Sequence, residues 1–230
     1  MKQEIKAMWK KIKEEQGIIV LATCFFFNIL RYISVFQWVR SANNRICAHR
    51  HKSPKDSFIG GYHFPEIWVL CNITCGIMVY ALMVNFQLPK VLGAIFVAFA
   101  IMRAFEIMVY HVNVLLFDPL MTEARGEKYA IKSPVRMLLL LLINMAEYVL
   151  CFSIVYLFFV PEAVNFDYWQ SFTLSTSAFL NIGLPENNTS PEIIVRIARI
   201  ETILGVFMNL ICIARFINML PSVNSLDKEK

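Results

Sequence analysis

Residues 181–184, Asn-Ile-Gly-Leu, have the composition of a backbone cation-binding strand. A cation filter replaces the water around an ion with carbonyl groups, which requires an extended segment with a residue free of side-chain restraint. Gly183 is the only glycine in the polar interval 161–191. Glu186, which follows the segment, would concentrate cations at an external mouth. The predicted selectivity filter consists of Asn181, Ile182, Gly183 and Leu184.

Such a filter needs a short helix before it, and residues 165–180 are polar and aromatic enough to form one. The segment is about four helical turns long, too short to cross a bilayer. Its predicted pore-helix residues are Thr176, Ser177 and Phe179. A helix that returns through an extended segment is tolerated at membrane depth only where protein or water surrounds it, as in a pore loop. The alternative is an ordinary external loop with an interfacial helix, in which Gly183 merely forms a turn.

The whole chain has the composition of a membrane protein. Of its 230 residues, 57% are hydrophobic and 17% are charged, and the mean hydropathy is +0.55. Soluble domains carry about a quarter charged residues, so a soluble enzyme, a nucleic-acid-binding domain and a disordered regulator are poor interpretations. Five apolar blocks have the length that crosses a hydrocarbon core of about 30 Å. They are residues 18–39, 67–86, 91–117, 137–160 and 193–220.

We therefore predict an all-α integral membrane protein with about five transmembrane helices plus a re-entrant pore helix and filter loop, assembling as a tetramer. The chain divides into an amphipathic interfacial helix (1–16), an N-terminal transmembrane bundle (17–135) with a basic loop (40–55), a pore module (136–221) and a polar tail (222–230). Trp9 and Ile12 share the apolar face of the first segment, which is expected to lie among lipid headgroups.

Charge distribution gives a partly contradictory orientation. Basic loops favour the cytoplasm, so residues 40–55 and 118–136 should be inside, as should the C-terminus, and residues 161–191 outside. Five complete spans would then place the lysine-rich N-terminus outside, against the same rule. Asn28, Arg31 and Gln37 interrupt the first apolar block. Either that block does not fully cross, or the N-terminus is an exception.

Two motifs in the C-terminal part carry a family resemblance. Residues 177–184, Ser-Ala-Phe-Leu-Asn-Ile-Gly-Leu, resemble the pore loops of the Trk/Ktr/HKT potassium transporters and, more distantly, the Thr-x-Gly-Tyr-Gly filter of potassium channels. Residues 196–205 are similar to inner helices of two-span potassium channels, which often place an arginine, a glutamate and then a hinge glycine. The resemblance covers about residues 137–220. It implies a homotetramer conducting monovalent cations, since one chain holds one pore loop.

The filter departs from the potassium-channel pattern. The second glycine is absent, and Leu184 stands where tyrosine or phenylalanine is common. A non-selective cation pore is at least as consistent with the sequence as a selective one. In the last apolar block, the predicted pore-lining or gate residues are Gly205, Asn209, Cys212 and Phe216. Gly205 allows either a bend or close helix contact, and Glu201 is expected to pair with Arg196 or Arg199.

Other charged and metal-ligating residues give weaker evidence of a functional site. Arg103 and Glu106, three apart in the third apolar block, are expected to pair with each other, because a voltage sensor needs several arginines. Cys47, His49, His51 and His63 have metal-binding side chains without a recognised zinc spacing. We predict no metal, no cofactor and no enzymatic activity, since no catalytic cluster is visible in the spans.

The basic loop has the composition of an anion-binding surface. Its candidate residues are Arg45, His49, Arg50, His51 and Lys52. Anionic lipid headgroups are the default partner, and a nucleotide or short nucleic acid is a candidate gating ligand. In architecture alone, the chain is similar to bacterial anti-phage channel effectors such as Hailong, which implies antiviral defence at the bacterial inner membrane. The alternative function is a non-conducting membrane scaffold that recruits an acidic partner through this loop.

Overall fold

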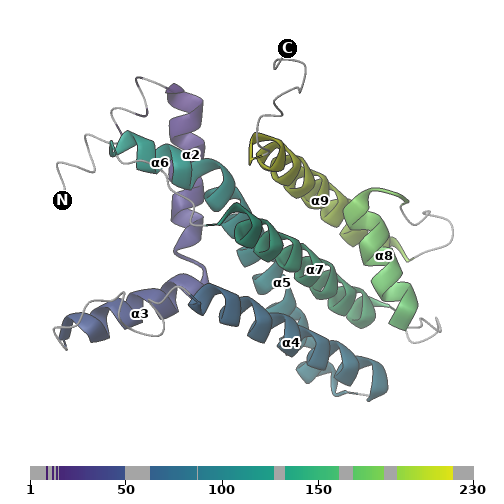
Figure 1. Ribbon diagram of the computed structural model, residues 1–230. Helices are drawn as coiled ribbons and strands as arrows, with labels where there is room; N and C mark the ends of the chain where they lie inside the picture. The colour runs from purple at the N-terminus through teal and green to yellow at the C-terminus, as the bar shows by residue number, and fades with distance from the viewer. Residues whose placement is uncertain are drawn as a thin grey trace, which may run out of the picture.

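The computed structural model describes Trp9, Ile12, Glu14 and residues 16–49, 63–86, 88–126, 133–160, 168–183 and 191–219. Every regular element within these residues is a helix (Figure 1). The helices are α2 (Ile18–Arg31), α3 (Val35–His49), α4 (Phe64–Asn85), α5 (Lys90–Val112), the π-helix η2 (Asn113–Phe117), α6 (Asp118–Ala124), α7 (Pro134–Phe159), α8 (Tyr168–Leu180) and α9 (Glu192–Met219).

Four helical segments are long and apolar enough to cross a membrane. They are Phe64–Asn85, Lys90–Ala124, Val135–Phe159 and Glu192–Ala214. These segments confirm the predicted all-α class and coincide, to within seven residues at each end, with four of the five apolar blocks. Pro134 in the first turn of α7 and Pro65 in that of α4 suit helix starts, where a missing N–H costs nothing.

The first apolar block forms two helices instead of one straight span. Helices α2 and α3 meet at residues 32–34 and are bent by 72°. They count as a fifth span only if the bent pair is taken as one crossing. Arg31, which weakened this block in the sequence, lies at the break, and its Nη1 is 2.9 Å from Oδ1 of Asp118. The bend thus brings the arginine to a carboxylate on α6.

Helix α7 is the centre of the bundle, with contacts to α4, α5, α8 and α9 (Figure 1). Glycines let two neighbours approach it closely. A Cβ at Gly76 of α4 would come within 2.9 Å of the Leu150 side chain, and one at Gly93 of α5 within 2.9 Å of Phe158. Small residues at such contacts allow helices to pack by van der Waals attraction where lipid offers no hydrophobic driving force.

The N-terminal segment packs on the protein at its described residues. Ile12 is 1% exposed and joins a cluster with Cys24, Val112, Phe117 and Met121. Trp9 makes an edge-on contact with Phe25, the ring centroids being 5.9 Å apart. Ile12 therefore packs against the helices of the bundle. Most of residues 1–15 lies outside the described part of the chain.

Candidate functional site

Helix α8 lies against α9 and runs in the same direction. Its Ser175 is 2.5 Å (Oγ to Oε1) from Glu201, and its Phe179 carbonyl accepts a 3.1 Å hydrogen bond from Nδ2 of Asn209. A Cβ on Gly205 would be 2.8 Å from that same carbonyl oxygen. Gly205 is halfway along α9, about 20 Å from the first residue of that helix at 1.5 Å per residue. The C-terminal end of α8 is thus level with the middle of α9.

The end of α8 has a defined cap. Asn181 has φ 55°, and its N–H donates to the Ala178 carbonyl at 3.2 Å. The next N–H, of Ile182, donates to the Ser177 carbonyl at 3.0 Å. This is the Schellman arrangement, in which a left-handed residue reverses the chain just after a helix, and asparagine tolerates that conformation.

The rest of the predicted filter is exposed or lies outside the described residues. Ile182 is 76% exposed. Gly183 has no atom within 4 Å of where a Cβ would stand, and its φ is outside the left-handed region, so neither space nor backbone within one chain requires glycine there. Leu184 lies outside the described residues, as does Glu186.

Two of the three predicted pore-helix residues have local roles in the fold. Phe179 is buried against Tyr148 of α7, with ring centroids 5.5 Å apart. The hydroxyl of Thr176 bonds to the Phe172 carbonyl within α8. Ser175, which the sequence analysis did not single out, is the buried residue whose hydroxyl lies within hydrogen-bond distance of both α7 and α9.

A buried carboxyl of α9 joins three helices. Glu201 is 0% exposed, and its two oxygens lie 2.5 Å from the hydroxyls of Ser175 and Tyr156. The Ser175 hydroxyl is also 2.8 Å from the Val149 carbonyl. The Ser175 hydroxyl has one proton and can donate it either to the Val149 carbonyl or to Glu201. Both contacts are hydrogen bonds when Ser175 donates to Val149 and a protonated Glu201 donates to the Ser175 oxygen. The cluster is then neutral and links α7, α8 and α9.

The predicted pair between Glu201 and Arg196 is wrong. Nη2 of Arg196 lies 2.5 Å from Oε1 of Glu192, one turn earlier in α9. Five residues along a helix correspond to a rotation of about 140°, which directs Arg196 outward while Glu201 faces α7 and α8. A spacing of four favours the exposed pair.

The predicted pore-lining residues divide along α9. Gly205 and Asn209 face α8, so Gly205 has the second of its two expected roles, close helix contact. Cys212 is half-buried, and Phe216 is 43% exposed. Another face of α9 is open in the single chain, at Ile200, Ile203, Phe207, Leu210 and Ile217.

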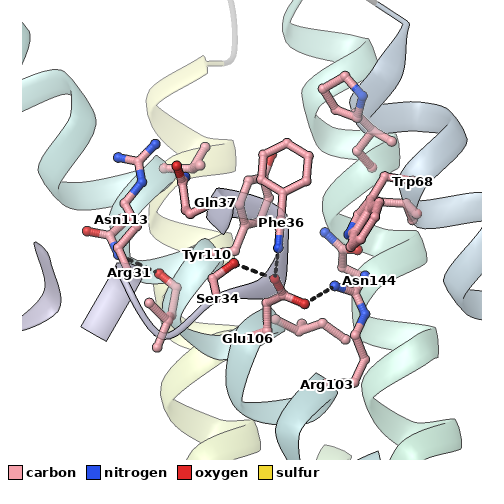
Figure 2. A pocket seen from close by; sticks show the side chains of 16 residues that line it. Arg31, Ser34, Phe36, Gln37, Trp68, Arg103, Glu106, Tyr110, Asn113 and Asn144 are labelled. Atoms are coloured by element: carbon pink, nitrogen blue, oxygen red, sulfur yellow. Dashed lines mark hydrogen bonds and ion pairs between the residues drawn. The ribbon is translucent and has the colours of Figure 1, made fainter. Parts of the chain in front are cut away.

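A second buried cluster, of charged groups, lies between α5 and α7 (Figure 2). Arg103 contacts Glu106 through Nη1 at 2.7 Å, which confirms the predicted pair. It also forms a two-pronged pair with Glu147, Nε to Oε1 at 2.5 Å and Nη2 to Oε2 at 2.9 Å. All three residues are at most 6% exposed. The sequence analysis missed Glu147, although a lone acid inside the block 137–160 was a signal that it needs a partner.

Glu106 also holds the break between α2 and α3. Its Oε1 accepts hydrogen bonds from the Ser34 hydroxyl and, at 2.9 Å, from the Phe36 N–H. Phe36 is in the first turn of α3 and Ser34 is the residue just before that helix, where unpaired N–H groups and the helix dipole favour a negative charge. The carboxylate of α5 therefore caps a helix that begins in the interior of the bundle.

A cavity with a mainly apolar wall adjoins this cap. Its volume, measured for the centres of water-sized spheres, is about 50 Å³, and α2, α3, α4, α5, η2 and α7 all contribute to its wall. Asn113, Asn144 and Trp68 each have a buried polar atom without a hydrogen-bond partner there. Asn113 begins the π-helix, a distortion that often marks functional positions.

The predicted anion-binding residues are only partly described. Arg45 and His49 are exposed on α3, four residues apart and so on one side of that helix. Arg50, His51 and Lys52 lie outside the described residues. Cys47 is buried and His63 pairs with Glu66. In the described part of the chain, no group of three or more His, Cys, Asp or Glu side chains is placed to hold a metal.

Comparisons of the chain with protein-family models, with curated proteins and with solved structures give no match. What can be inferred about function depends on the geometry of α7–α9 and of the break between α2 and α3.

Proposed function

We propose that the chain is one subunit of a homotetrameric pore-loop channel that conducts monovalent cations across a bacterial inner membrane. The observation that carries this proposal is the parallel pairing of α8 with the first half of α9. Helix α8 has 13 residues, about 20 Å, and ends level with the middle of a span. Residues 181–191 must return from that depth to the start of α9, and eleven extended residues reach up to about 36 Å. That length is sufficient for the re-entrant loop that we propose.

Exposure at the end of α8 supports assembly. Leu180 and residues 181–183 are exposed in the single chain. Irregular backbone at the middle of a bilayer is tolerated only against protein or water. Four copies around an axis would satisfy this requirement, with backbone carbonyls directed at a line of ions.

The open face of α9 supplies the surface that such an assembly needs. Ile200, Ile203, Phe207, Leu210 and Ile217 follow the alternating spacing of three and four residues that is typical of helix–helix seams. We assign the pore wall and the contacts between copies to this face. Gly205 and Asn209 then support the pore helix from behind.

Gating by an anionic ligand is the finer part of the proposal. Arg45 and His49 are exposed on α3, whose first turn is held by Glu106 of α5. A nucleotide, a short nucleic acid or a lipid headgroup bound there would act on the break between α2 and α3. Defence against phage would be the setting of such a channel. The same exposed residues favour the second function, a non-conducting scaffold for an acidic partner.

The decisive experiment is cation flux into liposomes with Gly183→Ala beside the wild type. A Cβ at this position meets no atom within 4 Å in one chain, so the variant should fold and assemble normally. In a closed filter the added Cβ of each of the four copies would restrict the backbone that directs carbonyls at the ions, so potassium and sodium flux should fall sharply. Gly126→Ala is the matched control, because it strains a residue with φ 77° far along the chain from the filter.

Three outcomes separate the alternatives. Wild-type flux in Gly183→Ala would contradict the filter. A silent tetramer would be tested again with nucleotides, and flux that appears only then identifies a ligand-gated channel. A silent monomer that loses partner capture on Arg45→Glu would be the scaffold.

A further inference from the structure

We propose that α2 and α3 form a re-entrant pair seated on the anionic lipids of the cytoplasmic leaflet, so that the start of α2 and the basic loop 40–55 lie on the same side of the membrane. The pair is then not a fifth crossing. This inference needs only that the four long apolar segments cross a membrane. It does not depend on the ion path proposed for residues 181–184, so its tests and liposome flux can fail independently of each other.

The order of the helices fixes which ends share a side. Helix α4 ends at Asn85 and the next apolar segment begins at Lys90, so these two ends lie on one side of the membrane. The other end of that second segment, at Ala124, therefore lies on the same side as Phe64, where α4 begins. The basic loop precedes Phe64 in the chain. An element that packs near Ala124 is thus on the side of the basic loop.

The first half of α2 packs at this end of the bundle. Ile12 and Cys24 share one buried cluster with Phe117 and Met121, which lie within seven residues of Ala124. Figure 1 shows α2 against α6 at the same end. A complete crossing by α2 and α3 would instead place the start of α2 beside the far end of α4. The cluster therefore favours a pair whose two ends are both on the side of the basic loop.

The break between α2 and α3 is level with the first turns of α4. Phe36 stacks on Phe64 with ring centroids 5.7 Å apart and makes an edge-on contact with Trp68 at 5.8 Å. Helix α4 has 22 residues, about 33 Å, so its first turns lie near the edge of a hydrocarbon core of about 30 Å. From the break, α3 extends away from α4, whereas a crossing would follow the length of α4 (Figure 1). The pair thus reaches only the edge of the core.

The exposed surface of the pair suits a leaflet of anionic lipid. Phe25 and Phe26 of α2 are each more than half exposed. On α3, Trp38 is 63% exposed, and the exposed Arg45 follows two turns later on the same side. Tryptophan is enriched where hydrocarbon meets headgroups, and basic residues bind the anionic lipids of the cytoplasmic leaflet. Residues 16–49 contain no acidic side chain, so the charge of the pair is complementary to that surface.

Thiol labelling tests the side on which α2 begins. Three single substitutions are made in the full-length protein, at residues that are all exposed: Gln16→Cys at the start of α2, Arg125→Cys after α6 and Asn85→Cys at the far end of α4. Sealed membrane vesicles of either orientation are treated with an impermeant maleimide. We expect Gln16→Cys to be labelled in the same vesicles as Arg125→Cys and not with Asn85→Cys. The wild type measures the background from the native cysteines.

Each other pattern of labelling contradicts the re-entrant pair. Labelling of Gln16→Cys together with Asn85→Cys would make the bent pair a fifth crossing. Labelling in both orientations would mean a mixed topology. Labelling in neither would place residue 16 within the hydrocarbon, because the reactive thiolate forms only where water has access.

The lipid contact has its own measurement. A full-length protein in which phenylalanine replaces the three other tryptophans retains only Trp38. Its fluorescence is measured in vesicles that contain spin-labelled phosphatidylglycerol or spin-labelled phosphatidylcholine. We expect stronger quenching by the anionic lipid, and Arg45→Gln should reduce this preference about fivefold, the effect of one basic residue at a membrane surface. Arg196→Gln, on α9 near the other side, is the matched control and should leave the preference unchanged.

Two results would overturn the lipid contact. One is equal quenching by the two lipids, or a preference that Arg45→Gln does not reduce. The other is a response of Trp38 to ATP in vesicles of phosphatidylcholine alone, which would identify a soluble phosphate ligand on α3 in place of a lipid surface.

Discussion

The two buried carboxyl clusters of this protein stabilise the interior in opposite ways. Between α5 and α7, Glu106 and Glu147 share the guanidinium of Arg103. Between α7, α8 and α9, Glu201 contacts only the hydroxyls of Ser175 and Tyr156. All of these carboxyl groups are buried, yet Glu106 and Glu147 share one guanidinium group, whereas Glu201 has hydroxyl partners and its set of hydrogen bonds is complete when it carries a proton. A buried acid is thus compatible with apolar helices in either form.

Because of this difference, the two clusters have different structural roles. A charged pair is long-ranged in a low dielectric, and Arg103 joins two helices while Glu106 reaches the first turn of α3. The neutral cluster is short-ranged and depends on hydroxyl geometry. It positions α8 without adding a fixed charge near the proposed ion path.

Removing the arginine should have the largest effect. Arg103→Met leaves Glu106 and Glu147 buried without a counter-charge, which we expect to destabilise the protein by about 3–5 kcal/mol. The measurement is the thermal unfolding of the purified protein in detergent. Arg196→Met removes an exposed pair and should cost about 0–1 kcal/mol. Equal losses in the two variants would contradict a special role for the buried cluster.

Neutralising each glutamate sharpens the comparison. Glu147→Gln removes one of the two carboxylates that bind Arg103 and should cost about 1.5–3 kcal/mol, the value of hydrogen bonds to charged groups. Glu201→Gln resembles a protonated carboxyl in shape and polarity, so its cost should stay below about 1 kcal/mol. The same unfolding measurement compares them. If Glu201→Gln were the more damaging variant, Glu201 would be ionised in the native protein.

Glycine contacts test how firmly α9 holds α8. Gly205→Ala places a methyl group 2.8 Å from the Phe179 carbonyl oxygen, which is backbone, so we expect a loss of about 1–3 kcal/mol and lower flux. Gly76→Ala meets the end of the flexible Leu150 side chain and should cost less. Thermal unfolding and liposome flux measured together distinguish the two. Normal flux in Gly205→Ala would mean that this contact does not position the filter.

The smallest effect concerns the cap of α8. Asn181→Ala forces an alanine into the left-handed conformation at about 1 kcal/mol, whereas Asn181→Gly suits the Schellman cap and should retain stability. Ion selectivity, measured as the potassium-to-sodium flux ratio, should nevertheless change in both, because Asn181 is the first residue of the proposed filter. An unchanged ratio in both variants would limit Asn181 to its capping role.

Much of the fold was readable from the sequence because hydropathy alone marks a helix that crosses a membrane. Four apolar blocks became helices within seven residues of their predicted ends, and the Arg103–Glu106 pair followed from a spacing of three. The block 18–39 did not form one straight helix, and the reason is local. Arg31 and the polar residues near it do not favour a straight span, and the chain bends there by 72°.

What the sequence by itself determined is the apolar length of each helix, the polar character of the segment before Gly183 and the presence of unpaired charges inside the blocks. Only the tertiary structure decided which partner each buried group has. Glu147 reaches Arg103 across 44 positions, and Ser175 reaches Glu201 across 26. Helical periodicity fixes neighbours three and four residues apart, but contacts between helices depend on how their faces rotate and cross when they pack. That rotation directs Gly205 and Asn209 toward α8 and leaves the face of α9 that carries Ile203 and Leu210 exposed in the single chain.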